Sequence, residues 1–245
     1  MELKEILNSV NIENNIATLN IYSDIVSSEW NCCTDEDVYP EFVSQFLETV
    51  NDKELHVHIN SGGGSAFAGV AIYNLLKRRN GKTITYVDSL AASAASLIAL
   101  AGDEMIMPAG SMLMIHKPWS YVVGNSDELR KEADNLDKIC ESFSEIYKEN
   151  LKNADDYEKV MEMVAKETWL KVSDCIELFA NAKADNTLKA CACIKSEILS
   201  RYKLPAELKV TDKISTEPND NDEDNDEIER MKMELEIEEE LMMLN

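Results

Sequence analysis

The chain has 245 residues, of which 44% are hydrophobic and 29% are charged, and its formal net charge is −23. This length and composition are typical of a globular protein with one main domain, and the longest apolar-rich run, residues 90–102, is too short and too polar to cross a bilayer. The negative charge argues against nucleic acid as a partner, because binding to phosphates requires clustered Lys and Arg.

The N-terminal residues carry no basic start followed by an apolar core, so we expect neither a secretory signal nor a transit peptide, and a cytoplasmic protein. The cysteines lack zinc-ribbon spacing, and we interpret them as reduced thiols. They are Cys32, Cys33, Cys140, Cys175, Cys191 and Cys193. His56 and His58 alternate along a predicted strand and share one of its faces, which favours a half-exposed strand over a zinc site. We therefore predict no metal and no cofactor.

Strand and helix signals alternate from residue 15 to residue 118. Residues 15–26 alternate apolar and polar side chains like a strand, and residues 39–50 have helical spacing after a Pro. The same criteria predict a strand at 53–64, a helix at 65–79, a strand at 82–90, a helix at 91–102, and two short apolar runs around a Pro-Ala-Gly turn within 104–118. This order predicts an α/β fold with crossover helices.

A long helix is predicted at 125–151, with Asn125 or Ser126 as its cap. A helix of this length can project beyond a small core and serve subunit contacts, or it can simply pack on the core; its spacing is compatible with both. Further helices are predicted at 155–166 and 173–180.

The last forty residues differ from the rest of the chain. Residues 211–245 hold 14 Asp and Glu against 3 Lys and Arg, which is nearly half of the net charge. We predict one main domain, 1–204, followed by an acidic linker, 205–227, and an acidic amphipathic tail helix, 228–245. The tail helix docks on a partner or remains solvated.

Three serines lie among alanines in "SLAASAASLIALAG", residues 89–102. Ser93 would stand at the start of a helix, where unpaired N–H groups and the helix dipole favour a negative oxygen, and Ala92 and Ala94 leave room for a substrate. Ser89 lies too early on the strand, and Ser96 lies one turn into the helix. The spacing therefore favours Ser93 as a nucleophile.

Two further features could support nucleophilic catalysis. Gly62, Gly63 and Gly64 lack the Gly-Lys-Ser/Thr ending of a phosphate loop, so they present N–H groups to a carbonyl oxygen or simply form a tight turn. His116 follows an apolar strand and could act as a general base or have a structural role.

Taken in order, "INSGGGSAFAGVAIYNLL", "SLAASAASLIALAG" and "MLMIHKP" resemble the ClpP family of serine proteases, over about residues 16–184. The motifs "VDSLAASAAS", "HKPW", "GNSDELRK" and "ETWL" resemble most the phage and prophage head maturation (prohead) protease branch. The resemblance implies that Ser93 is the nucleophile and His116 the general base. It also implies an oxyanion hole formed by the N–H groups of Gly64 and Ala94.

The same resemblance implies a third member of a catalytic triad. Glu167 stands where most ClpP sequences have an aspartate, two residues before an aromatic residue that is Trp169 in this chain. A glutamate can accept a hydrogen bond from the histidine ring and stabilise the imidazolium. Asp174 is the alternative carboxylate.

The resemblance implies a ClpP/crotonase-like fold of stacked βα units with a protruding handle helix, assembled into a ring-shaped homo-oligomer. The function that it implies is that of a serine endopeptidase cutting capsid, scaffold or portal proteins during phage head maturation. One alternative is a cellular ClpP-type peptidase subunit working with an ATP-driven unfoldase, and another is a catalytically idle assembly factor. A serine–lysine signal-peptide-peptidase-like enzyme and a crotonase-type acyl-CoA enzyme fit less well, because the first does not need His116 and the second needs neither Ser93 nor His116.

Overall fold

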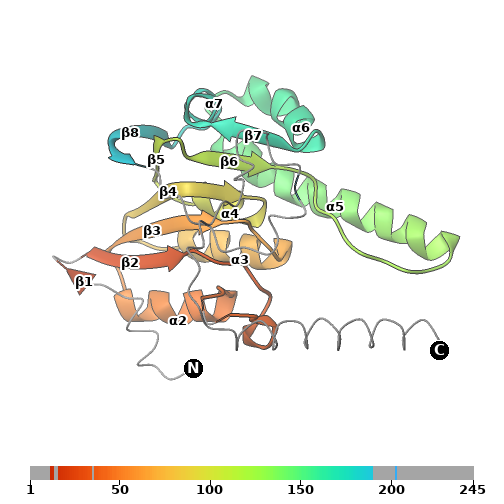
Figure 1. Ribbon diagram of the computed structural model, residues 1–245, viewed down its shortest axis with the longest axis horizontal. Coiled ribbons are helices and arrows are strands. Elements are labelled where there is room, and N and C mark those ends of the chain that lie inside the picture. The colour runs from red at the N-terminus through yellow and green to blue at the C-terminus, as the bar shows by residue number, and fades with distance from the viewer. Residues whose placement is uncertain (1–11, 14–15, 35, 190–201, 203–245) are drawn as a thin grey trace, which may run out of the picture. The chain divides into compact units, whose positions relative to one another are not determined.

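A mixed sheet forms the centre of the computed structural model, which describes residues 12–13, 16–34, 36–189 and 202 (Figure 1). In the described residues the strand order is β1-β2-β3-β4-β5-β8, and β6 pairs with both β4 and β7. The strands are β1 (Ile12–Glu13), β2 (Ile16–Ile21), β3 (Glu54–Ser61), β4 (Thr83–Ala92), β5 (Glu104–Ala109), β6 (Met112–Ile115), β7 (Thr168–Lys171) and β8 (Ala182–Lys189). The β1–β2 and β6–β7 pairs are antiparallel, and the other pairs are parallel.

The helices are α2 (Pro40–Val50), α3 (Ala66–Lys77), α4 (Ala94–Ala99), α5 (Ser126–Asn150), α6 (Tyr157–Ala165) and α7 (Val172–Leu178), with short 3-10 turns η1 (Glu29–Asn31) and η2 (Ala154–Asp156). Each of β2, β3 and β4 is followed by a helix and then by the next parallel strand of the same sheet. The predicted α/β fold with crossover helices is therefore confirmed.

Local sequence explains how α2 and α3 begin and which face they bury. Pro40 occupies the first turn of α2, where its missing N–H costs nothing. Ser65 caps α3 by accepting a hydrogen bond from the N–H of Ala68. Both helices bury apolar side chains in one core with those of β2 and β3, and α4 also contributes to this core.

The predicted boundary between strand and helix near residue 91 is wrong. β4 continues to Ala92, and α4 spans only Ala94–Ala99 instead of 91–102. Residues 90–92 pair with Met112–Met114 of β6, so their backbone groups are used by the sheet and cannot start a helix. The sharp turn that results falls at Ser93.

Three strands were absent from the sequence prediction: the two-residue β1, and the longer β7 and β8. β7 is only four residues long and pairs with β6, while β8 has the polar sequence AKADNTLK and pairs with β5. Neither segment has the clear alternation that predicts a strand, so tertiary pairing decides its structure.

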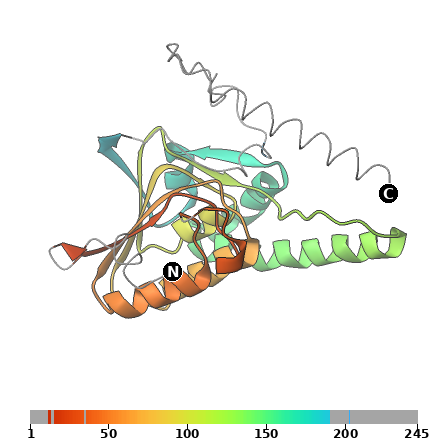
Figure 2. The same ribbon diagram turned by 60° about the horizontal axis from the view of Figure 1, so that its bottom comes forward.

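The sequence left open whether the long helix projects from the core or packs on it, and α5 does both. Its buried side chains all lie in its second half: Cys140, Phe143, Ser144, Ile146, Tyr147 and Asn150. The first half projects from the body, and the segment between β6 and α5 runs beside it in both views (Figures 1 and 2). Asn125 is the cap and forms a complete capping box with Glu128.

The predicted linker, 205–227, and tail helix, 228–245, lie outside the described residues. Among the described residues no helix is both long and apolar enough to cross a membrane. The four described cysteines are free thiols, as expected.

Candidate active site

Ser93 stands at the turn between β4 and α4 with φ 53° and ψ −122°. This backbone conformation is rare for a residue with a side chain and costs about 1–3 kcal/mol, so the surroundings must impose it. The Ser93 N–H donates to the carbonyl oxygen of Met114 over 2.8 Å, which continues the pairing of β4 with β6 up to the turn. The geometry resembles a nucleophile elbow, in which a strained turn presents the hydroxyl at the end of a strand.

His116 follows the last residue of β6 and lies beside Ser93 because β6 runs parallel to β4. Its Nε2 lies 2.7 Å from Ser93 Oγ, within hydrogen-bonding distance. Burial lowers the pKa of His116, and the negative charge of Glu167 opposes this by raising it. The lowered pKa favours a neutral imidazole, which can accept the Ser93 proton.

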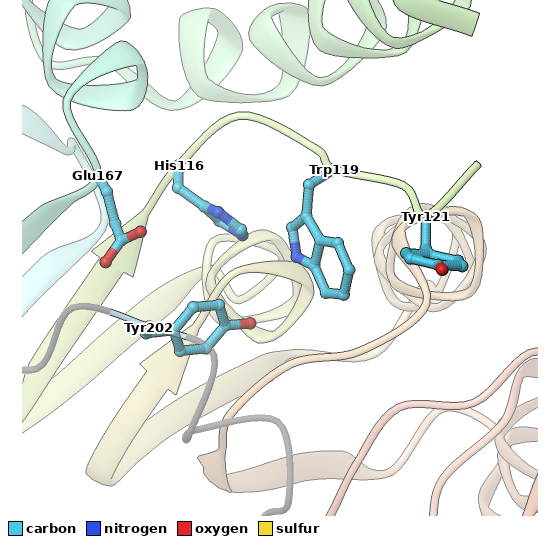
Figure 3. Close-up of a pocket in the computed structure, with 5 residues that line it drawn as sticks. All are labelled: His116, Trp119, Tyr121, Glu167 and Tyr202. Atoms are coloured by element: carbon cyan, nitrogen blue, oxygen red, sulfur yellow. The ribbon is translucent and has the colours of Figure 1, made fainter. Parts of the chain in front are cut away.

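Glu167 comes directly before β7, opposite the end of β6, because Ile115 pairs with Thr168. Its side chain lines the same cavity as His116, a space of about 610 Å³ that Trp119, Tyr121 and Tyr202 also border (Figure 3). Asp174, the alternative carboxylate, accepts a hydrogen bond from the Lys171 N–H at the start of α7. The carboxylate that faces His116 in the structure is therefore that of Glu167.

The glycine loop after β3 touches the Ser93 turn. Gly63 has φ +98°, and a Cβ atom there would lie 2.6 Å from the Ala92 carbonyl oxygen and 2.8 Å from Ser93 Cβ. Only glycine fits this conformation and this close approach. The last glycine of the loop, Gly64, lines a second cavity of about 380 Å³, to which Ser93 and His116 also contribute.

Backbone hydrogen bonds hold the loop in place. The Ile25 N–H donates to Gly63 O over 2.8 Å, and the Ser65 N–H donates to Ile25 O over 2.7 Å. These bonds flank Gly64 and do not use its amide. Ala94 is the first residue of α4, where an N–H has no partner within the helix. Gly64 lines the same cavity as Ser93, and Ala94 directly follows Ser93.

The other serines of the motif occupy different environments. Ser96 is fully buried, and its hydroxyl donates to Ser93 O over 2.6 Å and lies 3.1 Å from the Tyr147 hydroxyl. Ser89 is part of β4. The structure therefore brings Ser93, rather than Ser89 or Ser96, to His116.

Two of the described cysteines, Cys140 and Cys175, are buried. Burial raises the pKa of Cys140, and it raises the pKa of Cys175 to about 12. A thiol held in its neutral form is a poor nucleophile and a poor metal ligand.

His56 and His58 share one face of β3, as predicted, and both contact the ring of Tyr86. His56 lies 2.9 Å from Glu54, and His58 lies 2.8 Å from Asp88. In the part of the chain that the structure describes, no three His, Cys, Asp or Glu side chains form a group that could hold a metal ion.

Sequence reasoning missed Tyr202. Its hydroxyl donates to Gly62 O over 2.8 Å, and its ring packs edge-on against His116 with centroids 5.2 Å apart. The surrounding sequence is polar and offers no periodic pattern; the only available signal is that Tyr202 is the last aromatic residue of the chain.

A family model described as Clp protease matches residues 19–178, which is more than half of the chain. This chain belongs to the Clp protease family. Among curated Clp relatives, an ATP-dependent Clp protease proteolytic subunit of Ligilactobacillus salivarius is 34% identical over 128 residues, covering 50% of this chain and 62% of that protein. A protein of the same name from Pleurastrum terricola is 36% identical over 106 residues, covering 42% of this chain and 54% of that protein.

A third relative, an ATP-dependent Clp protease proteolytic subunit 2 of Treponema denticola, is 30% identical over 128 residues, covering 51% of this chain and 62% of that protein. The chain thus spans between 54% and 62% of the length of these Clp relatives. A solved structure of a ClpP1 mutant from Listeria monocytogenes matches with a TM-score of 0.55 and 22% identity, over 69% of this chain and 91% of that chain. This likeness confirms the ClpP-like α/β fold.

Proposed function

We propose that this chain is a serine endopeptidase in which Ser93 is the nucleophile, His116 the general base and Glu167 the third member of the triad. The observation that carries the proposal is the 2.7 Å separation between Ser93 Oγ and His116 Nε2 at a strained strand-to-helix turn. Membership of the Clp protease family supports it.

The geometry supports a two-step acyl transfer. Ser93 Oγ attacks the carbonyl carbon of the peptide bond while its proton passes to His116 Nε2. Glu167 stabilises the imidazolium that forms, and the amides of Gly64 and Ala94 donate to the oxyanion. When the C–N bond breaks, His116 returns the proton to the leaving amine. Water then hydrolyses the acyl-enzyme with His116 as base again.

The proposed setting is a ring-shaped homo-oligomer that encloses the sites and cuts capsid, scaffold or portal proteins during phage head maturation. Its support is the resemblance of motifs such as "VDSLAASAAS" and "GNSDELRK" to that branch. The projecting half of α5 is the element that would serve contacts between copies. In this setting no nucleic acid, membrane or cofactor takes part, and the protein works in the cytoplasm or inside an immature capsid.

The names of the Clp relatives favour a second setting. They are proteolytic subunits of ATP-dependent Clp proteases, so this chain would be a peptidase subunit served by an ATP-driven unfoldase. The two settings share the site and differ in how the substrate enters.

Labelling with a fluorophosphonate probe and intact mass spectrometry test the activity. We expect one adduct on the natural chain, lost in Ser93→Ala and in His116→Ala. Ser89→Ala, within β4, is the matched control that keeps the adduct, because the hydroxyl within hydrogen-bonding distance of His116 is that of Ser93. Ser93→Ala should still assemble, since it removes a single hydroxyl. An assembled natural protein that takes no probe would overturn the proposal and favour an idle assembly factor.

Substrate tests distinguish the settings. Capsid, scaffold and portal proteins of the source genome are incubated with the natural chain and with Ser93→Ala, without ATP. Cleavage that depends on Ser93 supports head maturation. If the chain cleaves an unfolded protein such as casein but leaves the folded capsid, scaffold and portal proteins intact, the result favours the unfoldase-dependent setting.

A further inference from the structure

We propose that Tyr202 is a positioning residue of the active site, which locks His116 and the glycine loop together from a position beyond the family's matched region. The proposal rests on the proposed function. Its evidence consists of two contacts, one made by the ring and one by the hydroxyl of the same side chain.

The ring contact is with the proposed base. The Tyr202 and His116 rings meet edge to face, with an interplanar angle of 75°. This edge-to-face arrangement stabilises aromatic pairs by more than the free energy gained from burying their apolar surface. Figure 3 shows the Tyr202 ring facing His116, with Glu167 and Trp119 lining the same cavity. The imidazole is therefore restrained by a second ring as well as by Ser93.

The hydroxyl contact is with the proposed oxyanion loop. Tyr202 donates to the carbonyl oxygen of Gly62, the residue that opens the loop leading to Gly64. A buried carbonyl needs a donor, and this bond fixes the peptide plane before Gly63. The loop's position decides where the Gly64 amide points, so one side chain ties the base to the oxyanion hole.

Tyr202 is held firmly enough to act in this way. It is only 8% exposed and packs in a small apolar cluster with Leu90, Ala92 and Met114, which belong to the strands that precede Ser93 and His116. It also borders both cavities of the site. A side chain locked by packing can position its neighbours; an exposed one cannot.

The family match ends at residue 178, 24 positions before Tyr202. The contact thus comes from outside the region that the family model matches. Sequence comparison restricted to the matched region would not reveal it.

The ring also limits the access of water to His116. Burial is the largest influence on the pKa of His116 and lowers it. The charged group that faces the imidazole is Glu167, whose effect is opposite, while neighbouring Lys117 extends to Asp137. Removing the Tyr202 ring would hydrate the imidazole and favour its protonated form, so its pKa would rise.

The test compares Tyr202→Leu, which removes the ring, with Tyr202→Phe, which removes only the hydroxyl. Tyr157→Phe is the matched control, because the Tyr157 hydroxyl also donates a hydrogen bond, to Ser144 in another part of the fold. The first readout is the rate of reaction of His116 with diethyl pyrocarbonate against pH, resolved from His56 and His58 by peptide mass spectrometry. This reagent modifies neutral imidazole, so the midpoint reports the pKa of His116 without requiring activity.

The second readout is the rate of fluorophosphonate labelling of Ser93. In Tyr202→Leu we expect the His116 midpoint to rise by about half a pH unit or more, with slower labelling. In Tyr202→Phe we expect an unchanged midpoint and labelling slower by about three- to tenfold, the effect of one lost hydrogen bond. Tyr157→Phe should match the natural chain in both readouts.

Three outcomes would overturn the proposal. An unchanged midpoint in Tyr202→Leu shows that the ring does not control His116, and unchanged labelling in Tyr202→Phe shows that the hydroxyl does not position the loop. Faster labelling or peptide cleavage in either variant shows that Tyr202 occupies space needed by the substrate.

If the natural chain takes no probe, the proposed function fails, whereas the His116 titration still tests the effect of the Tyr202 ring. Because Tyr202→Phe retains the packing, it remains informative if Tyr202→Leu fails to fold.

Discussion

Backbone strain is concentrated in the residues proposed for catalysis. In the described part of the chain, Asn51, Ser93 and Glu167 are the non-glycine residues with positive φ, and two of them belong to the proposed triad. Gly63, which contacts the Ser93 turn, and Gly64, which contacts Ile25, also have positive φ. Strain of this kind persists only where the surroundings impose it, as the β4–β6 and β6–β7 pairings do here.

Glu167→Gln should lower turnover by about 10²–10⁴-fold, because the imidazolium loses its counter-charge and the ring its orientation. The negative charge of Glu167 raises the pKa of His116, so its removal lowers that pKa. The acid limb of kcat/KM, where His116 must lose its proton, should therefore move to lower pH. The measurement is cleavage of a fluorogenic peptide between about pH 5 and pH 9.

Asp174→Asn is the matched control for that experiment. Asp174 accepts from the Lys171 N–H, so this variant should weaken the start of α7 and leave the acid limb in place. A greater loss of turnover in Asp174→Asn than in Glu167→Gln would show that Asp174 is the catalytic carboxylate.

At the scale of single elements, the two halves of α5 are stabilised by different interactions. Its second half is buried: Tyr147 reaches Ser96 of α4, and the Asn150 side chain donates to the Tyr73 hydroxyl of α3. Its first half has exposed side chains, such as Leu129, and begins at the Asn125–Glu128 capping box. The projecting half thus depends on local interactions more than on packing.

Asn125→Ala removes the cap and should destabilise the start of α5 by about 1 kcal/mol. Hydrogen exchange of residues 126–131 should become faster, while exchange in the buried second half stays unchanged. Asn135→Ala, in the middle of the exposed face, is the control and should have little effect. Equal exchange in Asn125→Ala and the natural chain would mean that contacts with other copies hold this half in place.

At the scale of the whole molecule, the net charge of −23 opposes the proposed assembly. Copies of a strongly acidic chain repel one another, and salt screens that repulsion over a distance of about 10 Å at 0.1 M. Exposed apolar side chains, among them Trp119, Tyr121, Val123 and Leu129, lie in the segment before α5 and at its start. They are candidates for the attraction that assembly requires.

Raising NaCl from about 20 mM to about 300 mM should therefore increase the assembled fraction, as measured by sedimentation velocity at fixed protein concentration. Ser93→Ala is the control and should respond in the same way, since its charge is unchanged. Dissociation on addition of salt would contradict the expectation and would show that paired opposite charges hold the copies together.

The alternating elements from residue 16 to residue 118, the cap of α5 and the residue types at the site were predictable from local sequence. Periodicity, caps and small-residue motifs are written within a few neighbouring residues, and the motif around Ser93 distinguishes it from Ser89 and Ser96 by spacing alone. The resemblance to the ClpP family, and with it the ClpP-like fold, was also predictable, because it depends on short motifs that follow one another in the family's order.

Only the tertiary structure decided the rest. β4 extends to Ala92, and β7 and β8 form, because distant strands supply the hydrogen bonds that local propensity does not predict. The family resemblance named Glu167 and kept Asp174 as the alternative, whereas the position of Glu167 beside His116 results from the β6–β7 pairing. Tyr202 reaches His116 and Gly62 across 86 and 140 positions of sequence. Such contacts depend on how the whole chain packs, and a local pattern in a polar segment carries no information about them.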